Sequence, residues 1–336
     1  IALGRLEATA DLADYLSSVV GQAKVRLDKL DSDVVQIENL RADFHDAKGG
    51  LRFDLAAIVN GADALMRGDL IQRGSSLSIG LAEVNVSKSS SSVRLEAPRK
   101  VSFENGTLTF QKLGLVSDGG RAVVSGFAGR RGLALKIGLT RFPAALANVF
   151  RDELGLRGTI DGSIAAKRSL LKPVAAVSLD WHNASAAAWK EASLPPVSIS
   201  LKGELQDDKF ENNLTVRGVD GLNVRIAGGG TLSNAQMLSQ RVTGEVPLSL
   251  ANSALATRGT RLSGKATLVS VVSGNTAAPE LSGTVTFSAV TVAEPASGLR
   301  LNNVNGVAQL KDDSILIEEL RGQSDKGGSA SLTGSI

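Results

Sequence analysis

The stretch LSGTVTFSA, residues Leu281–Ala289, alternates apolar or small residues with hydroxyl-bearing residues. Successive side chains of a β-strand point to opposite faces, so this pattern predicts a strand with one apolar and one wet face. The residues expected on the apolar face are Leu281, Gly283, Val285, Phe287 and Ala289. A parallel strand buried on both faces would read as a continuous apolar run, so antiparallel pairing is favoured.

The same period of two recurs along most of the chain and predicts an all-β protein. In Val197–Leu201, for example, the apolar residues alternate with Ser198 and Ser200. The fold class predicted from these stretches is an elongated, curled, mostly antiparallel repeat β-sheet with a few short amphipathic helices. The candidate lining of its apolar face is Leu108, Phe110, Val197, Ile199, Leu201, Leu222, Val224, Ile226, Leu281, Val285, Phe287, Ile315 and Ile317.

Turn motifs separate the alternating stretches at intervals of about 8–12 residues, which is typical of hairpin-rich proteins. Asn105-Gly106 lies between two such stretches and is a strong hairpin signal. Asp207-Asp208 and Asp312-Asp313 are also expected to form turns, because aspartate favours turn conformations. Gly129–Gly132 is a further candidate turn.

A glycine near the end of an alternating stretch recurs every 104 residues, at Gly126, Gly230 and Gly334. Pro143 and Pro247 are separated by the same interval. Such a repeat is typical of a stacked array in which each unit contacts its neighbours. It favours an array over a compact enzyme with one core.

The organisation that we expect is one continuous array cut from a longer chain. Residues 1–75 form a β-rich part with a short helix, and residues 76–141, 142–240 and 241–336 form three β-repeats. Helices are predicted at Asp11–Val20, at Phe142–Leu154 and at Leu248–Ala256, because apolar residues there recur at helical spacing. Pro143 is expected at the first position of the second helix.

The apolar face has an unusual composition. Hydrophobic residues make up 43% of the chain but aromatic residues only 4%. A sheet with one apolar face must cover it, and three short helices are too few. Either two sheets pack together, or one sheet curls lengthwise and encloses an aliphatic trough that would suit acyl chains.

Catalytic, metal and nucleic-acid functions find little support in the sequence. The chain has no cysteine, two histidines, and 37 basic against 34 acidic residues. Gly259–Lys265 has phosphate-loop spacing, but Ala266 stands where serine or threonine should bind magnesium. Basic residues are scattered among acidic ones, whereas nucleic-acid binding needs a clustered basic face. We therefore expect no enzyme, cofactor, metal or nucleic-acid partner, and no apolar run spans a membrane.

The repeat resembles the TamB/AsmA-like family of Gram-negative bacteria over residues 75–336. The segments that carry the resemblance are LRGTIDG (Leu156–Gly162), LSGKATL (Leu262–Leu268), PELSGTV (Pro279–Val285), GVAQL (Gly306–Leu310) and SLTG (Ser331–Gly334). The resemblance implies a long curled sheet with an apolar groove, the β-taco. It also implies a periplasmic segment of a protein anchored in the inner membrane, working with a TamA-like Omp85 outer-membrane barrel.

Three functions remain open from the sequence. The leading one is a non-enzymatic conduit in which phospholipid acyl chains slide along the apolar face between the two membranes. The second is a scaffold that offers sheet edges or the groove to outer-membrane proteins and autotransporters during their assembly. The third is a purely structural β-array. An open aliphatic face favours the first, and a closed two-sheet core favours the third.

Overall fold

The computed structural model describes residues 2–13, 20–32, 35–89, 91–129, 132–149, 152–169, 172–232, 237–325 and 327–335. These residues form 23 strands of one antiparallel sheet together with a few short helical segments. The all-β antiparallel fold predicted from the alternation is confirmed. The chain divides into two compact units, Ile1–Ala175 (unit 1) and Ala176–Ile336 (unit 2), and the boundary falls within β14 (Lys172–Ser185).

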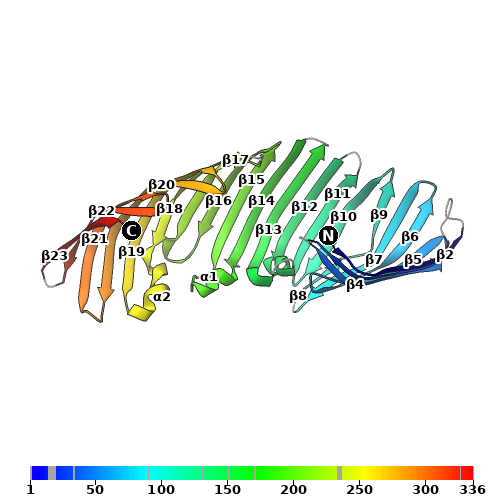
Figure 1. Cartoon of the computed structure of the whole chain (residues 1–336), viewed down its shortest axis with the longest axis horizontal. Helices are drawn as coiled ribbons and strands as arrows, with labels where there is room; N and C mark the ends of the chain where they lie inside the picture. The colour runs from blue at the N-terminus through cyan, green and yellow to red at the C-terminus, as the bar shows by residue number, and fades with distance from the viewer. Residues whose placement is uncertain are drawn as a thin grey trace. The chain divides into compact units, whose positions relative to one another are not determined.

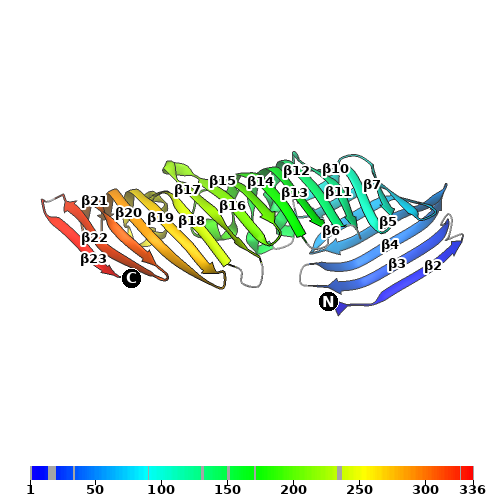
Figure 2. The same cartoon turned by 90° about the horizontal axis from the view of Figure 1, so that it is seen from above.

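Unit 1 is an antiparallel sheet in which most strands pair with the next one along the chain (Figures 1 and 2). Its strands are β1 (Ala2–Leu3), β2 (Leu6–Ala13), β3 (Val20–Asp31), β4 (Gln36–Ala47), β5 (Gly50–Val59), β6 (Ala62–Arg73), β7 (Ser76–Lys88), β8 (Ser91–Leu95), β9 (Arg99–Glu104), β10 (Thr107–Ser117), β11 (Gly120–Gly129), β12 (Gly132–Pro143) and β13 (Arg157–Ser169). The short strands β8 and β9 together fill the place between β7 and β10.

The strands of unit 2 also pair in sequence order (Figure 1), and β19 and β20 are longer than the strands of unit 1. Its strands after β14 are β15 (Val197–Gln206), β16 (Lys209–Arg217), β17 (Asn223–Thr231), β18 (Met237–Pro247), β19 (Arg261–Asn275), β20 (Ala278–Glu294), β21 (Leu299–Lys311), β22 (Ser314–Ser324) and β23 (Ser329–Ser335). Among the described residues, α1 (Ala187–Glu191) and α2 (Asn252–Leu255) are its α-helices. Figure 1 shows both at the same ends of the unit 2 strands.

The predicted turns join strands as expected. Asn105-Gly106 connects β9 to β10, where Glu104 pairs with Thr107. Asp207-Asp208 connects β15 to β16, and Asp312-Asp313 connects β21 to β22. Asp207 and Asp312 have φ angles of 58° and 53°, a left-handed conformation that aspartate tolerates better than most residues. Gly129 pairs with Gly132, so β11 and β12 form the expected hairpin; residues 130–131 lie outside the described part of the chain.

The predicted helix at Asp11–Val20 is wrong at both of its ends. Residues up to Ala13 belong to β2, Val20 begins β3, and these two residues are directly paired. Residues 14–19 lie outside the described residues. At both ends of the stretch, the pairing of β2 with β3 overrides the helical spacing.

The other two predicted helices lie where they were expected, but much of each is three-ten helix and not α-helix. The stretch expected as a helix over 142–154 contains three-ten segments, η1 (Ala144–Val149) and η2 (Asp152–Leu154). Pro143 ends β12 and pairs with Thr159, so it is the last strand residue and not the first helical one. The third prediction is confirmed by the run η4 (Leu248–Ala251), α2 and η5 (Ala256–Arg258).

β-Bulges interrupt the ladders and correct one prediction for the apolar face. Ala289 has a φ of 51°, and the register shifts between Phe287 and Val290. Ala289 is therefore exposed, and Val290, at 4% exposure, takes the apolar phase in its place. Similar shifts at Lys112 and Arg141 lie on β10 and β12. Bulges increase the local bend and twist of a strand, which lets a sheet curl.

The accessible surface is large for the chain's mass. It amounts to 20575 Å², whereas a globular monomer of 34.8 kDa would expose about 13,000 Å². No large side chain among the described residues is fully buried. Much of the sheet therefore lacks a second layer.

Candidate apolar binding surface

The cross-strand register of unit 2 places its candidate residues on one face of the sheet. In an antiparallel ladder, directly opposed residues project to the same face. One row of opposed residues runs from β15 to β22 through Ile199, Val216, Val224, Gly244, Leu268, Val285, Ala308 and Ile317. A second row runs parallel to it through Leu201, Leu214, Ile226, Val242, Ser270, Gly283, Leu310 and Ile315.

The remaining candidate residues of unit 2 lie beside these rows. Phe287 and Leu281 are on the same strand as Val285 and share its phase. Leu222 precedes β17, and its carbonyl accepts the Gly218 N–H at 3.0 Å. A Cβ placed on Gly218 would lie 2.9 Å from Leu222 and 3.3 Å from Val197, so these two side chains converge there. All candidate residues of unit 2 thus share one surface, which we call the apolar face.

The apolar face of unit 2 is half-exposed. Val285, Phe287 and Ile226 are of intermediate burial, and Ile315 is 41% exposed. The cluster of buried hydrophobic residues found among the described residues lies in unit 1 instead. The small residue Ala308, at 2% exposure, is covered by its larger neighbours. A half-buried aliphatic surface of this extent has apolar area left to bury against another molecule.

A polar pair interrupts this face. Gln240 on β18 is 6% exposed, and its Nε2 donates to Asn212 Oδ1 at 2.8 Å. The two residues reach each other across Gly228, which is opposed to both and has no side chain. Within the part of the chain that the structure describes, Gln240 Oε1 has no hydrogen-bond partner. The apolar face is therefore continuous in register but not uniform in polarity, which the alternation pattern did not reveal.

The opposite face of unit 2 is polar. Glu245 and Lys265 form an exposed ion pair at 3.1 Å, and Arg225 Nε donates to Asn213 Oδ1 at 3.1 Å. Exposed pairs of this kind contribute about 0.2–1 kcal/mol each. Their main effect is to keep this face solvated, although Val269 and Leu316 are also exposed on it, at 42% and 50%.

In unit 1 the candidate residues belong to a more enclosed surface. Leu108 and Phe110 pack against a cluster of three buried residues, Phe53, Leu81 and Val101. Further residues that pack against this cluster are Phe44, Met66, Leu70, Ile79, Val84, Leu95 and Leu113. The same alternation therefore gives a packed core in unit 1 and a half-exposed face in unit 2.

Two asparagine clips fasten the helical segments to the strands that follow them. Asn148 in η1 accepts from the Leu156 N–H at 2.9 Å and donates to the Leu156 carbonyl at 3.1 Å. Asn252 in α2 makes the same two bonds with Leu262, at 2.7 and 3.0 Å. The asparagines are 104 residues apart, the spacing of the sequence repeat. Sequence reasoning missed them, although this shared spacing was a usable signal.

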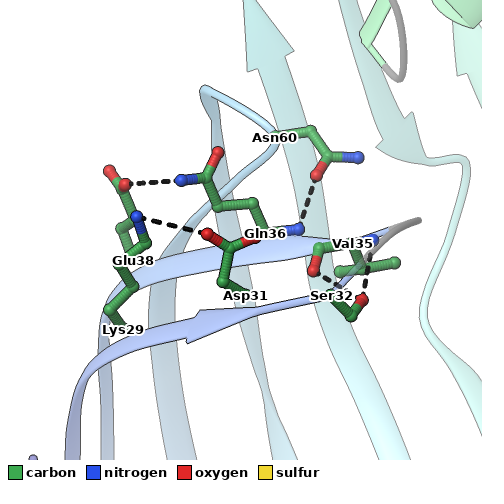
Figure 3. Close-up of polar contacts among 7 residues, drawn as sticks. All are labelled: Lys29, Asp31, Ser32, Val35, Gln36, Glu38 and Asn60. Atoms are coloured by element: carbon green, nitrogen blue, oxygen red, sulfur yellow. Dashed lines mark hydrogen bonds and ion pairs between the residues drawn. The ribbon is translucent and has the colours of Figure 1, made fainter. Parts of the chain in front are cut away.

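A polar cluster joins two turns of unit 1 (Figure 3). Ser32 Oγ donates to the Val35 carbonyl at 2.9 Å and accepts from its N–H at 3.1 Å, which closes the connection between β3 and β4. Asn60 Oδ1 then accepts the Gln36 N–H at 2.7 Å, and the Asn60 N–H donates to the Gln36 carbonyl at 2.8 Å. These bonds tie the start of β4 to the turn after β5.

The charged groups of this cluster are engaged in structural contacts. Asp31 pairs with Lys29 at 3.4 Å, and Glu38 accepts from Gln36 Nε2 at 3.1 Å (Figure 3). Over the described residues, no group of three or more histidine, aspartate or glutamate side chains is placed to hold a metal ion. The helices found in these residues are too short and too polar to cross a membrane.

The two histidines of the chain lie in different units. His45 lies on β4 in unit 1 and is opposed to Arg52, and His182 lies on β14 in unit 2. Trp181 and Trp189 pack together with ring centroids 6.1 Å apart, which holds α1 against β14.

Comparison of the chain with models of known protein families, with curated proteins and with solved structures finds no match.

Proposed function

We propose that the chain is a periplasmic segment of the TamB/AsmA-like type, whose apolar face carries phospholipid acyl chains between the inner and outer membranes. The observation that carries the proposal is the half-exposed aliphatic face of unit 2. Its opposed residues run in register from β15 to β22 on one side of the sheet, from Ile199 to Ile317. The opposite side is polar.

The energetics of such a surface suit transport better than storage. Each methylene that leaves water contributes about 0.8 kcal/mol, so one acyl chain has ample affinity for an aliphatic strip. Val, Leu and Ile make few directional contacts, so neighbouring positions along the strip differ little in energy. Gln240 and Asn212 bond to each other within this face, and Gln240 is only 6% exposed, so the pair offers a passing lipid little polar contact.

The resemblance to the family supports the cellular setting of the proposal. The segments PELSGTV (Pro279–Val285) and LSGKATL (Leu262–Leu268) belong to β20 and β19, which both contribute to the apolar face. On this basis the protein is a non-enzymatic part of an inner-membrane-anchored assembly, and its proposed partner is a TamA-like Omp85 barrel. A purified barrel of that type should bind the chain in a pull-down, and absence of binding would remove the partner from the proposal.

The test of the function uses two neighbouring residues as a matched pair. Val285 lies on the apolar face, and Thr286 is exposed on the opposite one. Native mass spectrometry of the chain purified from a lipid-containing host should find bound phospholipid in the wild type. Val285→Glu should lose most of that lipid, whereas Thr286→Glu should retain it.

Other outcomes would support other functions. Absence of lipid from the wild type under mild conditions would contradict the conduit and favour a structural array. Bound unfolded outer-membrane protein, displaced by Val285→Glu but not by Thr286→Glu, would favour the assembly scaffold. Equal loss of lipid in both variants would show that the lipid is not held by the apolar face.

A further inference from the structure

Two adjoining hollows lie over β9–β12 in unit 1. Their volumes are about 740 and 470 Å³. Both are lined by Arg99, Lys112 and Ser125. The larger one adds Phe127, and the smaller one adds Arg121 and Lys136.

The register places the hollows on the polar face of unit 1. Ser125 is opposed to Lys136, and Phe127 is opposed to Ala134. These residues alternate with Val124, which projects to the apolar side, although Gly126 and its partner Phe110, of the apolar phase, also border the larger hollow. The bulge in β10 adds an extra residue here, Lys112, with a φ of 49°. A bulge redirects a side chain, and this one directs a lysine into the mouth of both hollows.

The charged side chains that line the hollows are all positive. Four cations line them, and neither lining contains a carboxylate, although the chain as a whole carries 37 basic and 34 acidic residues. Glu96 engages one of the four: Arg121 Nε and NH2 donate to its two carboxylate oxygens, both at 2.8 Å. The hydrogen bond from Arg121 lowers the pKa of Glu96, so this pair stays charged at neutral pH.

Among the described residues, the other three cations form no ion pair with a carboxylate, although the charge of Arg99 also contributes to lowering the pKa of Glu96. Arg99 Nε donates to the Lys112 carbonyl at 3.2 Å, which holds its guanidinium over the bulge. Like charges gathered at one hollow raise the local positive potential, and an anion relieves it. Phe127, at 37% exposure, adds an apolar side to the larger hollow.

We propose that these hollows bind a phosphate-bearing anion, with Arg99, Lys112 and Lys136 as the phosphate-binding residues and Phe127 beside any apolar part of the ligand. A lipid headgroup and a soluble organic phosphate present the same chemistry to these residues. The inference is independent of the acyl-chain function, because that function is assigned to the apolar face of unit 2 and the hollows lie in unit 1; Phe110, one of the candidate lining residues predicted from the sequence, borders the larger hollow. Guanidinium and ammonium groups are the usual partners of phosphate oxygens.

Isothermal titration calorimetry with the full chain tests the proposal and separates the two sources. The ligands are dihexanoyl phosphatidic acid, glycerol 3-phosphate and dihexanoyl phosphatidylcholine, whose net charge is zero. Both phosphatidic acid and glycerol 3-phosphate should bind more tightly than phosphatidylcholine, and binding should fade in about 1 M salt, where the Debye length is about 3 Å. If phosphatidic acid binds more tightly than glycerol 3-phosphate, the ligand is a lipid. If the two bind equally, the ligand is a soluble phosphate.

The variants use charge-matched pairs. Lys112→Gln with Lys136→Gln removes two cations from the hollows, and Lys24→Gln with Lys48→Gln removes two exposed cations elsewhere in unit 1. The first pair should weaken phosphatidic acid binding by about tenfold, given about fivefold or less for each exposed charge contact. The second should change it by less than about twofold, since distant charges are screened.

Three results would overturn the proposal. In the first, the wild type binds neither phosphatidic acid nor glycerol 3-phosphate. In the second, it binds phosphatidylcholine as tightly as phosphatidic acid, and in the third, the two variant pairs weaken binding equally. Far-UV circular dichroism ensures that the compared variants are folded. If the Lys112 variant fails to fold, Lys136→Gln alone should still weaken binding by about threefold, and no change in that variant would refute the site.

Discussion

Glutamate introduced into the two units should destabilise them to very different extents, because one apolar surface is closed and the other is half-exposed. The perturbations are Leu81→Glu in unit 1 and Val285→Glu in unit 2. Leu81 is 8% exposed and belongs to the buried cluster with Phe53 and Val101. Val285 is of intermediate burial on the apolar face.

The expected magnitudes follow from these burials. A fully buried valine contributes about 1.5–3 kcal/mol, so half-buried Val285 contributes about 1 kcal/mol. The lower β-propensity of glutamate adds up to about 1 kcal/mol. Its carboxylate reaches water, so Val285→Glu should cost about 1–2 kcal/mol in the free energy of unfolding and leave unit 2 folded.

Leu81→Glu should cost much more. Truncation of a buried leucine alone costs about 2–5 kcal/mol, and burial of a carboxyl group without partners adds several kcal/mol. The sum is comparable with the whole stability of a typical domain, about 5–15 kcal/mol. Unit 1 of this variant should therefore be unfolded or close to it at room temperature.

The assay uses the position of the tryptophans. Both tryptophans of the chain, Trp181 and Trp189, lie in unit 2 and pack together. Urea unfolding followed by tryptophan fluorescence therefore reports on unit 2, whereas far-UV circular dichroism reports on both units. Leu81→Glu should lose part of the dichroism signal while the fluorescence transition persists.

Two results would refute this reasoning. Complete unfolding of unit 2 in Val285→Glu would mean that its apolar face is a closed core, and the conduit would lose its basis. A loss below about 2 kcal/mol in Leu81→Glu would mean that the unit 1 cluster is open to water. Thr286→Glu, on the polar face beside Val285, is the control for the introduced charge itself.

Three further predictions concern the clip, an ion pair and the array. Asn252→Ala should lower the free energy of unfolding by about 1–3 kcal/mol in urea titrations, since two half-buried hydrogen bonds disappear. The pKa of Glu96 is lowered below its usual 4.5 by Arg121, so the stabilising effect of this pair is complete above pH 4.5 and declines as pH falls through the lowered value. The wild type and Glu96→Gln should then converge in thermal stability on acidification, and a constant difference would contradict this. Fragments 1–236 and 237–336 should each show β-structure and cooperative melting, with a tendency to associate through the freed strand edges; disorder in both would refute a modular array.

The sequence predicted the strands and the shared face because both depend on local pattern. Alternation at Leu281–Phe287 and at Val197–Leu201 determines which side chains lie together, since a one-residue slip would turn every apolar side chain to solvent. The Asn105-Gly106 hairpin was predictable for a similar reason, because the turn residues themselves adopt the required conformation.

The errors arose where the outcome depends on partners distant in sequence. The bulge at Ala289 shifts the phase by one residue, and nothing in LSGTVTFSA marks the place. The helix predicted at Asp11–Val20 has helical spacing, but β2 and β3 pair with each other there. Gln240 reaches Asn212 only because Gly228 lies between them on a third strand.

The difference between the two units can be traced to the distribution of phenylalanine. Seven of the nine phenylalanines lie in unit 1, and Phe210 and Phe287 are those of unit 2. Of the seven, Phe53 belongs to the buried cluster and Phe44 and Phe110 pack against it, whereas Phe103 and Phe127 are exposed. An aromatic side chain buries about 150–250 Å², so a curled sheet that carries several can fill the space above its own apolar face. Phe53 and its neighbours do this in unit 1.

Unit 2 has the same alternation of apolar and polar residues but fewer large aromatic side chains. Its rows consist of valine, leucine, isoleucine and small residues, and Phe287 is opposed to Gly306 on one side and Ala266 on the other. Side chains of this size leave an aliphatic face only half-covered by its own strands. Ala266 and Ala308 are already covered by their neighbours, at 6% and 2% exposure, so larger residues there would clash and would not fill the face. The area left to bury lies over the larger aliphatic residues, such as Ile315 at 41% exposure, and we propose that acyl chains pack against these.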